Sequence, residues 1–114
     1  MTKKVSERKC ISDLEQILQK RRFTDLVGEQ PSALKITLQT RTKLPDQISG
    51  RLYLLYDIVD HLQGAYDYEG IRRWFDRSRT ELENKSPSQY LGPAWDPKGE
   101  YAQRLLTLAR SLSG

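Results

Sequence analysis

The sequence has little of what several classes of protein require. Among its 114 residues there is one cysteine, Cys10, and one histidine, His61, so neither an internal disulfide nor a Cys/His zinc site can form within one chain. No apolar run approaches the roughly 20 residues of a membrane-spanning helix, and no apolar segment follows the basic start as in a secretory signal. These absences predict a soluble, cytoplasmic protein without a bound metal ion.

Signals for strands and for catalysis are also scarce. We find no sustained alternation of apolar and polar residues, no glycine-rich phosphate loop and no catalytic dyad. A chain of this length with 37% hydrophobic residues can bury one modest core, and a large cofactor cavity would consume much of it. The sequence therefore predicts neither an enzyme nor a protein with a cofactor.

Positive charge is concentrated in the first half of the chain. Residues 1–56 contain 11 Lys and Arg against 6 Asp and Glu, a net charge of +5. Residues 57–114 contain 8 against 9, a net charge of −1. This asymmetry predicts a surface for a polyanion in the first half and a different task for the second half.

Helical periodicity extends along the chain and predicts an all-α fold in two modules, residues 1–63 and 64–114. We expect helices at about 6–20, 23–27, 31–39, 45–63, 65–76, 86–91 and 99–112, with Ser86 and Pro87 opening the sixth. Apolar spacing predicts that Ala33 and Ile36 face inward. In the last helix Tyr101, Leu105, Leu108 and Leu112 follow one another at steps of 4, 3 and 4 residues.

Residues 23–39 have the layout of a helix-turn-helix: a short helix, a turn with Gly28, and a second helix opened by Pro31. In that motif the second helix enters the major groove and flanking cations hold phosphates. Two packed helices with a solvated face are the alternative on pattern alone. If DNA is bound, we expect contacts from Gln30, Ser32, Lys35, Thr37, Gln39, Arg41 and Lys43.

The second module contains a more specific pattern. Residues 70–77 read Gly-Ile-Arg-Arg-Trp-Phe-Asp-Arg, residues 82–87 read Leu-Glu-Asn-Lys-Ser-Pro, and Tyr90-Leu91 and a terminal helix follow. This pattern resembles the toxin-binding domain of the Xre/MbcA/ParS antitoxin family. The segments at 26–28, 31–34 and 41–45 resemble the Xre-type helix-turn-helix of the same family, so the resemblance covers about residues 12–113.

The chain departs from the family pattern in two places. Glu83 and Asn84 stand where the family often has two glycines, and asparagine still tolerates a left-handed backbone. Thr37 and Thr40 replace the aromatic residue and the glycine that often end the second helix of the motif.

The resemblance implies the antitoxin of a type II toxin–antitoxin pair. Such a protein neutralises a RES-like, NAD-consuming toxin by covering its active site, and it represses its own operon as a DNA-binding dimer. The resemblance places toxin contacts in the last helix and the tail at 111–114, with Tyr101, Arg104, Leu105, Leu108 and Leu112 as candidates. Two alternatives remain open: a stand-alone helix-turn-helix transcription regulator, and a protein-interaction adaptor whose DNA motif has decayed.

Aromatic and cationic residues of the second module are further candidates for toxin contact, because an exposed large aromatic side chain is a good interface anchor. Trp74 and Phe75 are adjacent, so we expect one in the core and the other half exposed. The neighbouring arginines could meet an acidic toxin rim or assist at a phosphate of NAD, but the more common arrangement, which we expect, is a solvated face paired with Asp76, Glu81 and Glu83. The added candidates for toxin contact are Arg73, Trp74, Arg77 and Tyr90.

Overall fold

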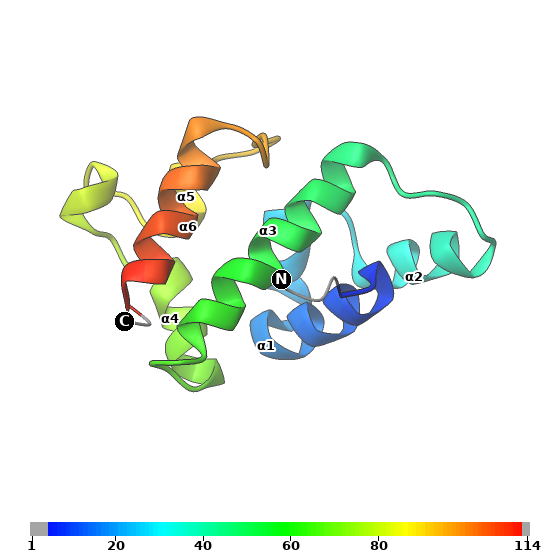
Figure 1. The fold of residues 1–114 in the computed structure, drawn as a ribbon, viewed down its shortest axis with the longest axis horizontal. Coiled ribbons are helices and arrows are strands. Elements are labelled where there is room, and N and C mark those ends of the chain that lie inside the picture. Colours follow the sequence, from blue (N-terminus) through cyan, green and yellow to red (C-terminus); the bar gives the residue numbers. More distant parts are fainter. Residues whose placement is uncertain (1–4, 113–114) are drawn as a thin grey trace.

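The computed structural model describes residues 5–112, and these residues are all-helical, as predicted. α3 runs through the middle of the molecule, with α2 at one end of the long axis and α5 and α6 at the other (Figure 1). The elements are α1 (Glu7–Val27), α2 (Pro31–Gln39), α3 (Asp46–Leu62), α4 (Tyr68–Asp76), a 3-10 turn η1 (Thr80–Leu82), α5 (Pro87–Leu91) and α6 (Glu100–Leu112).

α1 consists of two helical segments. Gln19 interrupts it with φ 71° and ψ 157°, a conformation that side chains other than glycine rarely adopt. Ser6 caps the first segment by accepting a hydrogen bond from the Lys9 amide at 3.2 Å. The two helices expected at about 6–20 and 23–27 therefore correspond to the two segments of α1.

α3 is the central helix of the core. Its apolar stripe is wide, and Leu52, Leu55 and Leu62 are fully buried between α1 on one side and α6 on the other. The loop at 92–99 lies directly against it, because a Cβ atom added to Gly50 would meet Pro97 Cγ at 2.7 Å. Glycine at position 50 thus permits a close approach that any side chain would prevent.

Buried side chains from both expected modules form one continuous core. Arg51, only 8% exposed, connects the two: its Nε donates to the Trp95 carbonyl at 2.9 Å and its guanidinium donates to the Val27 carbonyl at 2.8 Å. Trp95 Nε1 in turn donates to the Leu26 carbonyl at 2.6 Å. The turn near residue 64 therefore joins two helical groups that pack against each other.

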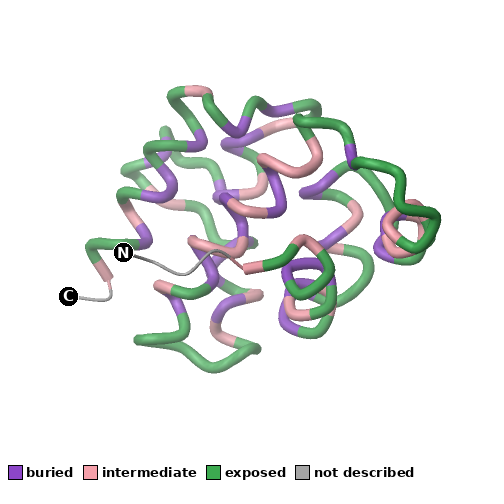
Figure 2. Tube along the Cα trace, turned by 45° about the vertical axis from the view of Figure 1, so that its right-hand side comes forward, coloured by how far each residue is buried: buried purple, intermediate pink, exposed green. Residues whose placement is uncertain are grey.

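Two expected orientations are wrong. Ile36 is 60% exposed, because α2 packs mainly on α1 and needs only a narrow apolar face (Figure 2). Trp74 and Phe75 are both buried, in an edge-to-face contact with ring centroids 5.1 Å apart, because α4 lies between α1 and α5. In α6, Tyr101 is 55% exposed, and the buried face consists of Leu105 together with Ala102, Leu106 and Ala109.

The start of α5 is as predicted. The Ser86 hydroxyl accepts from the Gln89 amide at 3.2 Å and the Gln89 side chain accepts from the Ser86 amide at 3.0 Å, which forms a capping box. In the preceding turn Glu83 and Asn84 both have positive φ, 58° and 64°. The backbone therefore makes a left-handed turn at the two positions where the resembling family often has glycine.

Candidate functional site

The second segment of α1, the turn and α2 form a helix-turn-helix unit. Gly28 ends α1 with φ 92°, and its amide donates to the Thr24 carbonyl at 2.8 Å. Pro31 occupies the first helical position of α2, where its missing N–H leaves no helical bond unmade. The main neighbour of α2 is α1, and α2 lies at one end of the molecule (Figure 1), with Ser32, Ile36 and Gln39 exposed.

α2 ends in a Schellman motif with an arginine in the left-handed position. Arg41 has φ 60°, its amide donates to the Leu38 carbonyl at 3.1 Å, and the Thr42 amide donates to the Thr37 carbonyl at 3.1 Å. Glycine usually occupies this position because it has no Cβ. The motif fixes the Arg41 backbone directly beyond the end of α2.

Five of the seven residues predicted to contact DNA are exposed on this unit, and two are partly engaged within the chain. Lys35 Nζ forms an ion pair with Glu15 Oε1 at 2.9 Å, which ties α2 to α1. The Thr37 hydroxyl donates to the Ala33 carbonyl at 3.0 Å and is half-buried. The exposed residues are Gln30, Ser32, Gln39, Arg41 and Lys43.

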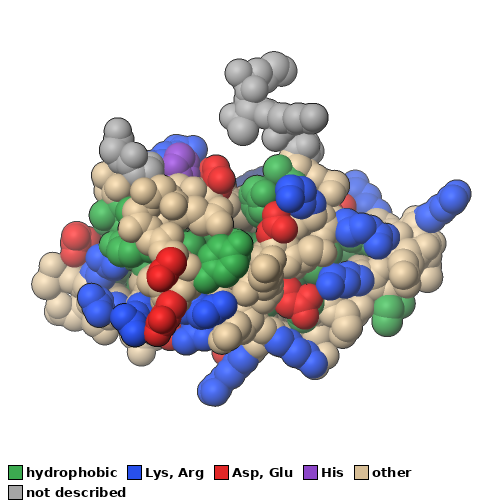
Figure 3. Space-filling view, turned by 90° about the horizontal axis from the view of Figure 1, so that it is seen from below, with side chains coloured by type: hydrophobic (Ala, Val, Ile, Leu, Met, Phe, Trp, Pro, Cys, Tyr) green, Lys and Arg blue, Asp and Glu red, His purple; other side chains and the backbone are tan. Residues whose placement is uncertain are grey.

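Basic side chains lie across the α1–α2 end of the face in Figure 3, with acidic side chains among them. Lys43 lies 3.9 Å from Asp46, but both side chains are almost fully exposed, so water screens this pair. Lys20 and Arg21 are also exposed, at the start of the second segment of α1. The unit can therefore present cations to a polyanion on both sides of its turn.

The exposed surface of α6 is built around Tyr101 and Arg104. Tyr101 packs edge-to-face on Tyr90 with ring centroids 4.9 Å apart, and Arg104 donates to the Tyr90 hydroxyl at 3.1 Å. This hydrogen bond raises the pKa of the Arg104 guanidinium above its ordinary value. Tyr90 itself is buried and supports the two outer side chains.

The residues predicted to contact a toxin divide into an exposed and a buried group. Trp74, Tyr90 and Leu105 are buried, so a partner that meets this surface as it stands would not contact them. Leu108 and Leu112 are half-buried against the core, and of the predicted tail, residues 113–114 lie outside the described residues. The exposed candidates are Arg73, Arg77, Tyr101 and Arg104.

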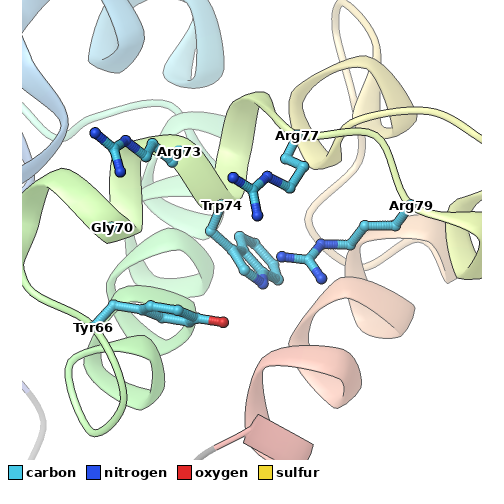
Figure 4. Close-up of a pocket in the computed structure, with 6 residues that line it drawn as sticks. All are labelled: Tyr66, Gly70, Arg73, Trp74, Arg77 and Arg79. Carbon is cyan, nitrogen blue, oxygen red and sulfur yellow. The ribbon is translucent and has the colours of Figure 1, made fainter.

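A cavity of about 170 Å³ adjoins α4 (Figure 4). The Arg79 guanidinium lies over the Trp74 ring, with Cζ 5.3 Å from its centroid. Gly70 and the arginines at 73 and 77 belong to the pattern quoted from residues 70–77, whereas Tyr66 belongs to no motif. The cavity is lined by Tyr66, Gly70, Arg73, Trp74, Arg77 and Arg79.

The expected charge pairs of this arginine cluster are wrong. Asp76 accepts from Arg22 on α1 at 2.6 Å, and Arg73 pairs with Glu69 at 2.7 Å. Arg72 donates to the Ile17 carbonyl at 2.7 Å, which attaches α4 to α1. The contacts of Asp76 and Arg72 join residues far apart in the sequence, so local charge spacing could not predict them, whereas Arg73–Glu69 is a pair within one helical turn.

Comparison with known proteins gives no match among family models, curated proteins or solved structures. Within residues 5–112 no helix is long and apolar enough to cross a bilayer. The same part of the chain contains no group of three or more His, Cys, Asp or Glu side chains arranged for a metal ion.

Proposed function

We propose that this protein is a DNA-binding antitoxin that represses its own operon and neutralises a RES-like, NAD-consuming toxin. The observation that carries the proposal is α2: a helix opened by proline after a three-residue turn, packed mainly on α1 and exposed at one end of the molecule. A helix held in this way can enter a major groove without disturbing the core.

In this proposal the two ends of α2 have different tasks. Gln30 and Ser32 at its start are exposed and can bond to base edges, since glutamine and serine side chains both donate and accept. Arg41 and Lys43 follow its end and bind backbone phosphates. A homodimer would place two such helices in successive major grooves.

Toxin neutralisation is assigned to the opposite end of the molecule. Tyr101 and Arg104 of α6 combine a large exposed aromatic ring with a guanidinium, and such side chains are enriched at the centres of protein interfaces. A contact of about 800 Å² per partner would be ordinary for a stable complex and sufficient to cover an active-site opening.

The DNA-binding part is tested by titrating the protein against its own upstream DNA at several salt concentrations. The variant Arg41→Gln/Lys43→Gln should bind more weakly, and the slope of log K against log salt should decrease by about 2, because two phosphate contacts are lost. Lys98→Gln, which removes an exposed cation from the loop before α6, is the matched control and should change neither value. Absence of binding at low salt would contradict repression.

The neutralisation part is tested by co-expression with the product of the neighbouring reading frame and a growth assay. The native chain should restore growth, and Tyr101→Asp should not, because it places a charge at the centre of the proposed contact. The far-UV circular dichroism spectrum of the variant should match that of the native chain, which would show that the loss of neutralisation is not caused by unfolding. Full growth with Tyr101→Asp would contradict the assignment of the toxin contact to α6.

A second candidate, a protein-interaction adaptor, is favoured by one observation on α2 itself. Ile36 is 60% exposed at the middle of the helix that would face DNA, while Lys35 beside it is held by Glu15. An exposed apolar side chain suits a protein contact better than a phosphate surface. Ile36→Asp separates the two: it should weaken DNA binding if α2 reads DNA, because it places a carboxylate against the phosphates, and it should weaken only partner binding if α2 is a protein contact.

A further inference from the structure

The cavity beside α4 is too large for a single ordered water. Its volume of about 170 Å³ exceeds by roughly tenfold the ~10–15 Å³ that one water requires. It lies at the α4 end of the molecule, away from α2 (Figure 1). Whatever occupies it is therefore separate from the DNA contacts proposed above.

Two buried hydrogen-bond donors at this cavity have no acceptor within the described chain. Trp74 is 2% exposed and its indole Nε1 is buried without a partner, and the same holds for Arg79 Nε. Buried donors of this kind are normally satisfied, so an unmade bond here indicates a missing acceptor. In Figure 4 Arg77 and Arg79 both extend towards the Trp74 indole.

The charges around the cavity are predominantly positive. Within residues 5–112 no carboxylate forms an ion pair with Arg77 or Arg79, and Asp76 is held by Arg22 on α1. Asp67 accepts from the Gly70 amide at the start of α4, and Glu81 accepts from the Thr80 hydroxyl. These carboxylates keep their charge, but neither they nor Glu69, which pairs with Arg73, are among the residues that line the cavity.

We propose that this cavity binds the phosphate group of a small phosphorylated ligand, with Arg77, Arg79 and the Trp74 indole as donors. Guanidinium groups match phosphate geometry with two parallel hydrogen bonds. Donors that converge from α4 and from the following turn need acceptor oxygens in more than one plane, which a tetrahedral phosphate has and a planar carboxylate lacks. The proposal does not depend on DNA or toxin binding.

Titration with inorganic phosphate, followed by ¹H–¹⁵N NMR of the indole groups, tests this site directly. The chain has two tryptophans, and Trp95 Nε1 already donates to the Leu26 carbonyl. Phosphate at millimolar concentration should therefore shift the Trp74 indole signal saturably and leave the Trp95 signal in place. Trp74→Phe assigns the two signals.

Variants and other anions complete the test. Arg77→Gln and Arg79→Gln should each weaken phosphate binding about tenfold, because each removes a charged donor. Lys98→Gln, the matched loss of a distant cation, should not change it. Arg77 is exposed, so its variant keeps the test valid even if Arg79→Gln disturbs the fold.

Two further titrations distinguish the source of the phosphate. ADP binding more tightly than inorganic phosphate would identify a nucleotide as the ligand class, and equal binding would identify the free anion; both support the site. The proposal is overturned if phosphate leaves the Trp74 signal unchanged, if acetate shifts it with equal affinity, or if Lys98→Gln weakens binding as much as Arg77→Gln.

Discussion

Cys10 shows how burial alters the chemistry of one side chain. It is fully buried in α1, and burial, with smaller effects from the Asp13 and Glu7 carboxylates, raises the pKa of its thiol to about 11. The ordinary pKa of a cysteine thiol, which we take for the unfolded chain, is near 9. Between these values the folded chain keeps the proton that the unfolded chain loses.

This difference predicts an alkaline loss of stability. Because the folded pKa is the higher one, the stabilisation is complete below pH 9 and is lost as the pH rises to about 11. The loss should amount to roughly 2–3 kcal/mol, two pKa units at 1.36 kcal/mol each. Urea unfolding at several pH values from 7 to 11 gives the free energy of unfolding of the native chain and of Cys10→Ala. The loss appears as the difference between the two slopes of this free energy against pH.

The comparison isolates the thiol. Burial is the main cause that raises the pKa values of Tyr53 and Tyr56, and this part is the same in both proteins; only the smallest part, the charge of Cys10 itself, differs. Equal slopes for the native chain and Cys10→Ala would show that the thiol does not couple to folding. The cavity left by alanine lowers the stability at every pH and does not affect the slope.

Helix ends show where this chain accepts local strain. Arg41 closes α2 in a left-handed conformation that costs a non-glycine residue roughly 1–2 kcal/mol. A functional side chain at a strained position is a common reason for such a cost. The cation at the end of α2 therefore stands where stability alone would favour glycine.

Arg41→Gly should raise the free energy of unfolding by about 1 kcal/mol and at the same time weaken DNA binding. Glu83→Gly is the matched control: Glu83 also has a left-handed backbone, but it lies in the turn before α5. It should stabilise the chain by a similar amount and leave DNA binding unchanged. If both variants bind DNA equally well, Arg41 has no role in the interface.

Elements with a local signal were predictable from the sequence. Pro31 at the start of α2 and Ser86–Pro87 at the start of α5 act through backbone geometry within one turn, and both helices begin as expected. The face of α6 was not predictable, because Ala102 and Ala109 carry little hydrophobic signal yet pack against α3. The cavity was not predictable for a different reason: which arginines stay unpaired depends on contacts between distant helices, such as the ion pair of Arg22 with Asp76.

The molecule as a whole is held together by contacts across the turn at residue 64. α6 packs on α3, α4 packs on α1, and the buried Arg51 bonds to carbonyls of both halves. Because the two helical groups share one core, unfolding of either group would expose the apolar side chains of the other to water. The two proposed tasks therefore belong to one cooperative unit.

Cooperativity predicts one unfolding transition. Both tryptophans lie after residue 64, so fluorescence reports on the second half, whereas far-UV circular dichroism reports on all helices. The two unfolding curves should have the same urea midpoint. Trp95→Phe should lower the free energy of unfolding by about 1–2 kcal/mol, because it leaves the buried Leu26 carbonyl without its donor. Both curves should therefore shift to lower urea concentration by the same amount. Separate midpoints, or a shift seen by fluorescence alone, would mean that the halves fold independently and that the shared core contributes little to stability.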